Sequence, residues 1–183
     1  MEERLKQISE KYNCEYKQWQ GTYDLSFQIR NLPLGIITLE QDRTDFNLIA
    51  RCEFLWGTST APSFLSGNNP DKYKFSITCQ LTNSALNAFH IMEHDWFRRR
   101  VFGRDLSIKS KDKLLAAFLS ENELIKDVYS FGKGSSELSP VIACYTKNRE
   151  ATININYQSF ELNTDILDKS IEFCNQLENY KLN

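Results

Sequence analysis

The chain has 183 residues, of which 41% are hydrophobic and 25% charged, a composition that fits one globular domain and excludes an intrinsically disordered protein. With 22 basic and 24 acidic residues, its net charge of -2 excludes a strong overall attraction to nucleic acid or acidic lipid. No apolar run follows the charges of the first six residues, and no stretch approaches the roughly 18 apolar residues that span a bilayer, so we expect neither a secretory signal nor a membrane segment.

The first half of the chain predicts a helix followed by strands. Leu5, Ile8 and Tyr12 recur at three- and four-residue spacing among charged residues, which predicts an amphipathic helix that stops before Gly21. Alternation of apolar and polar residues then predicts strands at 23–29, 36–40, 46–56 and 73–79. We expect Asn31–Gly35 to break the first two of these strands apart, and the polar segment 57–72 to be a long mobile loop.

Residues 85–103 fit two kinds of structure. Ala85, Phe89, Met92 and Trp96 form a helical stripe, whereas Phe89 and Ile91 also fit one face of a strand. The helical spacing of apolar residues does not continue beyond Trp96. This favours a strand that ends near Glu93, followed by a short helix capped by Asp95.

The second half predicts a short strand, a helical region, a hairpin and a final helix. The strand covers 106–108, and the helical region begins at Ser110 or Lys111. The hairpin joins 141–145 to 152–160, and Asn163 or Thr164 caps the final helix, whose apolar stripe comprises Leu167, Ser170, Ile171, Cys174 and Leu177. The sequence therefore predicts a single α+β domain over residues 1–183, with an antiparallel sheet of about six to seven strands and N-terminal, middle and C-terminal helices packed on it.

The segment His90-Ile-Met-Glu-His94 contains both histidines of the chain. It resembles the inverzincin motif, and this resemblance implies that His90 and His94 bind zinc while Glu93 activates water. The motif needs a helix, because on a strand the two histidines would lie about 13 Å apart at roughly 3.3 Å per residue. Since a strand is favoured, we expect no catalytic residue, metal or cofactor here, and a zinc-dependent hydrolase is the alternative.

A dense basic cluster follows the histidines. It comprises Arg98, Arg99, Arg100 and Arg104, continues through Lys109, Lys111 and Lys113, and adjoins Trp96 and Phe97. Basic residues beside aromatic ones bind phosphates or acidic protein segments, although arginines on a solvated helix face also pair with surplus acids. No nucleic-acid motif accompanies the cluster, which argues against nucleic acid as the partner.

Five widely spaced cysteines, none of them in Cys-x-x-Cys spacing, favour free thiols in a reducing compartment, so we expect a cytoplasmic protein. The element order resembles that of small bacterial secretion chaperones, and this resemblance implies an interaction domain. We therefore expect a non-enzymatic protein-interaction domain that binds a protein partner through an exposed apolar patch or a sheet edge. A nucleic-acid or acidic-partner binder that uses Arg98–Arg104 is a further alternative.

Overall fold

The computed structural model describes residues 2–25, 30–55, 72–93, 106–132, 138–159 and 163–180. Over these residues the chain forms one eight-stranded antiparallel sheet and four helices, which confirms the predicted α+β class with more strands than the six to seven predicted. The strand order across the sheet is β1-β2-β3-β4-β8-β7-β5-β6. The elements are α1 (Glu2–Lys11), β1 (Glu15–Leu25), β2 (Arg30–Arg43), β3 (Phe46–Leu55), β4 (Lys72–Leu81), β5 (Phe89–Glu93), β6 (Leu106–Ser110), α3 (Lys113–Glu121), α4 (Glu123–Gly132), β7 (Leu138–Lys147), β8 (Glu150–Ser159) and α5 (Thr164–Glu178).

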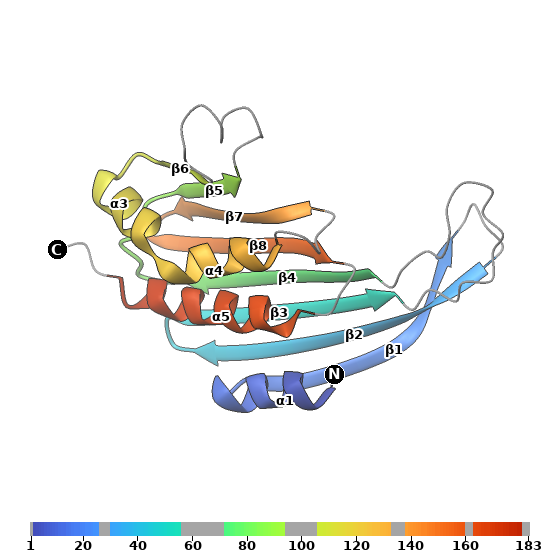
Figure 1. The fold of residues 1–183 in the computed structure, drawn as a ribbon. Coiled ribbons are helices and arrows are strands. Elements are labelled where there is room, and N and C mark those ends of the chain that lie inside the picture. The colour runs from blue at the N-terminus through green and yellow to red at the C-terminus, as the bar shows by residue number, and fades with distance from the viewer. Residues whose placement is uncertain are drawn as a thin grey trace.

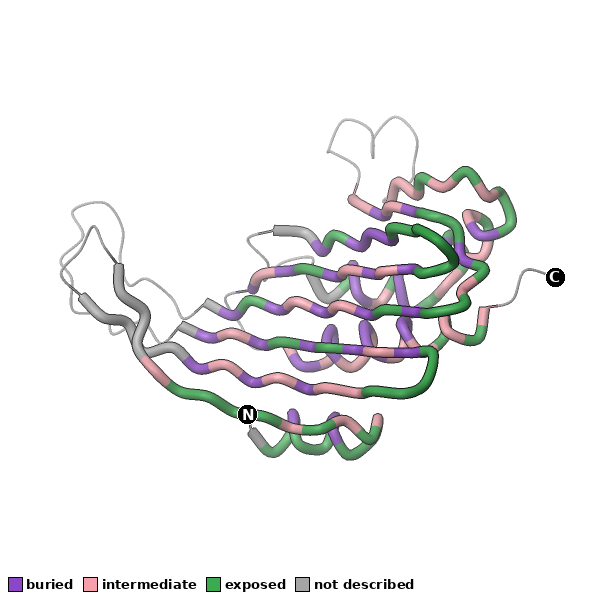
Figure 2. The backbone as a smooth tube through the Cα atoms, turned by 180° about the vertical axis from the view of Figure 1, so that it is seen from behind, coloured by how far each residue is buried: buried purple, intermediate pink, exposed green. Residues whose placement is uncertain are grey.

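The four described helices lie on one side of the sheet, in front of the strands in Figure 1. Helices α4 and α5 pack against each other and cover the middle strands, while α1 lies beside α5 near the β1 edge. From behind, the strands stand in front of the helices, and no described helix covers this second face (Figure 2). Over the described residues the domain is therefore a two-layer structure, with helices on one face of the sheet and none on the other. None of the described helices is both long and apolar enough to cross a membrane.

The hydrophobic core fills the space between the sheet and the helices. Phe75, Ile77 and Cys79 of β4 have no exposed surface, and Phe75 stacks on Tyr157 of β8 with ring centroids 4.5 Å apart. All five residues of the predicted stripe on α5 are buried, as the helical spacing predicts. The predicted cap is also confirmed, since Asn163 Oδ1 accepts the backbone N–H groups of Asp165 (3.0 Å) and Ile166 (3.4 Å).

Two boundaries in the first half differ from the prediction. The N-terminal helix ends at Lys11, before Gly21 as predicted, but β1 begins at Glu15, so the prediction that the first strand starts at Tyr23 is wrong. Asn13 takes a positive φ of 51°, and the Cys14 N–H donates to the Ser9 carbonyl oxygen (2.7 Å), an ending that asparagine tolerates better than most residues.

The predicted break at Asn31–Gly35 is also wrong, because β2 runs through it. Among the described residues Pro33 pairs only with Thr22 of β1, and a strand position with a partner on one side tolerates the missing N–H of proline. Gly35 lies beneath the ring of Phe54, which occupies the space that a Cβ atom would need.

Within the ambiguous segment, Phe89–Glu93 form strand β5, which ends at Glu93 as the favoured prediction states. The helical region begins after Asp112 rather than at Ser110 or Lys111, because Asp112 caps α3 by accepting the backbone N–H groups of Leu114 and Leu115. Except for Lys72, which begins β4, the predicted loop at 57–72 lies outside the described residues. The short helix predicted after Asp95 does so too.

Candidate functional site

The uncovered face of the sheet, called the open face below, consists of the alternate residues of each strand that point away from the helices. The strand pairings join residues of this face into rows that cross the sheet. One such row, in which each residue lies opposite the next, is Glu40, Ile49, Thr78, Asn154, Ala143, His90 and Lys109. Residues from seven strands that are far apart in the sequence therefore share one continuous surface.

Most of the large exposed apolar side chains of the described residues lie on the open face. The described residues expose five large hydrophobic side chains, and four of them lie here: Trp19 (51% exposed), Ile49 (42%), Val141 (41%) and Tyr145 (65%). The fifth, Leu114 (64%), lies on α3. Single apolar residues are common on protein surfaces, and these four lie on strands β1, β3 and β7, which are not neighbours in the sheet, so they are spread over the open face.

The polar groups between these apolar residues are mostly neutral and bonded to one another. The Ser76 hydroxyl donates to Asn156 Oδ1 (2.8 Å), and the Thr78 hydroxyl donates to Asn154 Oδ1 (3.1 Å). On the β1 side the charges are paired, since Lys17 forms ion pairs with Glu15 and Glu40. In the centre Arg51 pairs with Glu53 and Lys74 adds an exposed positive charge, so a partner meets mostly neutral polar groups with a few charges among them.

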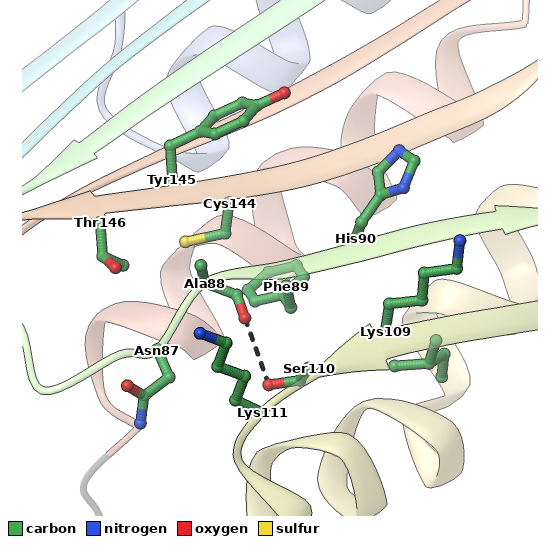
Figure 3. A pocket seen from close by; sticks show the side chains of 11 residues that line it. Asn87, Ala88, Phe89, His90, Lys109, Ser110, Lys111, Cys144, Tyr145 and Thr146 are labelled. Carbon is green, nitrogen blue, oxygen red and sulfur yellow. Dashed lines mark hydrogen bonds between the residues drawn. The ribbon is translucent and has the colours of Figure 1, made fainter.

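At the other side of the sheet, a hollow of about 740 Å³ borders the open face between β7 and β6, where β5 begins. His90, Lys109 and Tyr145 point to the same side of the three strands (Figure 3). His90 lies directly opposite Lys109 in the β5–β6 pairing, and Ala88, whose side chain is a single methyl group, lines the hollow just before β5. The hollow thus brings one predicted site residue, His90, next to two lysines of the predicted basic cluster, Lys109 and Lys111.

The structure separates the first two functional residues of the His-x-x-Glu-His motif. Both lie on strand β5, where residues three apart point to opposite faces. His90 lies on the open face, whereas Glu93 lies on the helix side, near the buried hydroxyl of Tyr129. His94 lies outside the described residues, so the motif as a whole stays a prediction. Within the described part of the chain, no group of three or more histidine, cysteine or acidic residues could hold a metal ion.

The other predicted site residues, Arg98, Arg99, Arg100 and Arg104, all lie outside the described residues, as do Trp96 and Phe97. The basic cluster can therefore be followed only through its lysines. Lys109 and Lys111 are exposed beside the hollow, and Lys113 is exposed at the start of α3.

The five cysteines are free, and four of them are buried. Loss of solvation raises the pKa of the Cys52 and Cys144 thiols to about 12 and also raises that of the half-buried Cys14. Cys174 also has a raised pKa because its thiol interacts with Cys79 and is buried. A protonated thiol is a poor nucleophile, so these four groups do not fit a cysteine-dependent catalytic site.

No protein-family model matches the chain, and no curated protein or solved structure matches it significantly. The resemblance to secretion chaperones therefore rests on element order alone. Sequence reasoning placed Tyr145 and Ile49 in strands but did not identify them as site residues. The sequence does contain a sign of this position, because Ile49 is an apolar residue that alternates with the buried Leu48 and Ala50 and therefore points to the opposite face of the strand.

Proposed function

We propose that this chain is a non-enzymatic protein-interaction domain that binds a protein partner over the open face of its sheet. One observation carries the proposal: four of the five large hydrophobic side chains that the described residues expose lie on this face. The partner that fits presents apolar side chains towards Trp19, Ile49, Val141 and Tyr145, with neutral hydrogen-bonding groups between them. Aromatic and aliphatic anchors of this kind contribute most of the binding free energy in protein interfaces.

The polar groups on the same face support a protein partner rather than a second helix layer of this chain. The hydroxyl and amide groups of Ser76 and Asn156 already form a hydrogen bond, and Ser76 is only half-buried. Such groups remain satisfied both in water and under a polar protein surface, which suits a face that is alternately covered and uncovered.

Site-specific photo-crosslinking tests the proposal. A photoreactive phenylalanine analogue is placed at Ile49 or at Tyr145, and in a control at Leu114, which is apolar and about as exposed as Tyr145 but lies on α3. Each variant is irradiated in extract from the source cells, and its crosslinked products are identified by mass spectrometry.

We expect one protein partner to crosslink from both open-face positions and not from Leu114, and purified partner to bind the unmodified domain. Crosslinks that form equally from all three positions, or from Leu114 alone, would contradict the proposal. Crosslinks to a second copy of the chain would also replace it, because the face would then be a self-association surface.

A further inference from the structure

The hollow between β7 and β6 has the size of a small-molecule site. Its volume is about 740 Å³, within the range of roughly 300–1,000 Å³ that is common for ligand pockets. Eight of its eleven lining residues lie on strands β5, β6 and β7, while Asn87 and Ala88 precede β5 and Lys111 follows β6. The short Ala88 side chain and the longer Tyr145 and Lys111 side chains are all part of its lining.

The charge of the hollow is positive. Two lysines, Lys109 and Lys111, line it and are exposed, while the eleven described residues of the lining include no aspartate or glutamate. Neither lysine forms an ion pair with a residue that the structure describes. The neighbouring acid is Asp112, whose carboxylate caps α3 and accepts the side-chain amide N–H of Asn87 (3.0 Å), so it is occupied by other partners.

The remaining polar groups of the lining fall into two sets. The Ser110 hydroxyl is already used, because it donates to the carbonyl oxygen of Ala88 (3.2 Å, Figure 3). His90, Thr146 and Tyr145 offer further hydrogen-bonding groups next to the lysines, and the exposed ring of Tyr145 offers a flat apolar surface. Ammonium and hydroxyl donors suit carboxylate or phosphate oxygens, and an aromatic ring suits an apolar or planar organic group.

We propose that this hollow binds a small organic anion, whose carboxylate or phosphate group is attracted by the exposed lysines Lys109 and Lys111 and whose apolar part packs on Tyr145. The site shares Tyr145 with the partner surface proposed above, but it rests on the charge and shape of the hollow and not on Trp19, Ile49 or Val141.

Nuclear magnetic resonance titration of the ¹⁵N-labelled chain tests this site directly. The probes are phenyl phosphate, inorganic phosphate and the uncharged benzyl alcohol. The variant Lys109→Met/Lys111→Met removes both charges, and the control Lys74→Met/Lys126→Met makes the same change in net charge on β4 and α4. Because all four lysines are exposed, we expect both variants to keep the melting temperature of the parent chain.

We expect phenyl phosphate to shift the backbone signals of residues 87–90, 108–111 and 144–146 in a saturable manner, more tightly than either other probe. The Lys109→Met/Lys111→Met variant should bind it about tenfold more weakly, whereas the control should bind like the parent. Signal changes spread over all exposed lysines, equal weakening in both variants, or no saturable binding would each overturn the proposal. Equal affinity for benzyl alcohol would do so as well, because it would show that the charge plays no part.

Discussion

Replacing one isoleucine on each face of the sheet measures which face is covered. Ile155 of β8 has no exposed surface and pairs with Ile77 and Ile142, which are also fully buried, under the helix layer. Ile49 of β3 lies on the open face and is 42% exposed. The substitutions Ile155→Ala and Ile49→Ala remove the same atoms from the same type of element, so strand propensity affects both similarly.

The burial of the two side chains sets the expected magnitudes. Truncating a fully buried isoleucine leaves a cavity and lowers the free energy of unfolding by about 2–5 kcal/mol. At Ile49 solvent fills the vacated space, so we expect a loss of about 1 kcal/mol or less, mostly from strand propensity.

Urea unfolding monitored by tryptophan fluorescence and circular dichroism gives the loss in free energy of unfolding for each variant, provided that the dependence of this free energy on urea concentration is the same as in the parent chain. Measurements at two protein concentrations serve as a control for self-association. An equal or larger loss for Ile49→Ala would refute the assignment of the two faces. A loss at Ile49 that grows with protein concentration would show that another copy covers the open face.

Four further outcomes follow from individual contacts. Gly35→Ala should destabilise the chain by about 1–3 kcal/mol in the same urea assay, because the added Cβ overlaps the ring of Phe54; a neutral effect would show that this ring moves freely. The carboxyl of Asp112 has a pKa below its usual 3.8 because backbone N–H groups donate to its carboxylate, so its contribution to stability is present above pH 3.8 and is lost as the pH falls through the lowered pKa. Asp112→Asn should therefore flatten the loss of stability in acid, and an unchanged loss would contradict the capping role. In the native chain a thiol reagent should modify Cys14 first and the other four thiols only on unfolding, whereas rapid labelling of all five would contradict their burial. Purified protein should hold no stoichiometric zinc and keep its melting temperature under a chelator; stoichiometric zinc lost on substituting His90 would revive the hydrolase hypothesis.

Much of the fold follows from local pattern. The hairpin between β7 and β8, the stripe on α5 and the strand ending at Glu93 were predicted because side-chain periodicity and capping residues lie close together in the sequence. The errors in the first half have a tertiary origin. Residues 15–20 are polar apart from Tyr16 and Trp19, and they form a strand because β2 offers a complete pairing partner.

The candidate site was harder to predict than the fold. The open face assembles residues from eight strands. Beyond β4 the order of the strands in the sheet differs from their order in the chain, and no local sequence pattern encodes that difference. His90 and Lys109 become direct neighbours only through the β5–β6 pairing. The sequence did single out both residues, for a metal motif and a basic cluster respectively, but it could not place them together because strand register is a long-range property.

The affinity of an identified partner for two matched variants tests the central claim most directly. Ile49→Arg introduces a charge in the middle of the open face, and Leu114→Arg introduces the same charge at an exposed apolar position on α3. We predict that Ile49→Arg weakens partner binding at least about tenfold in isothermal titration calorimetry, while Leu114→Arg leaves it unchanged. Unchanged binding by Ile49→Arg, with loss of binding by Leu114→Arg, would contradict the assignment of the open face as the partner-binding surface.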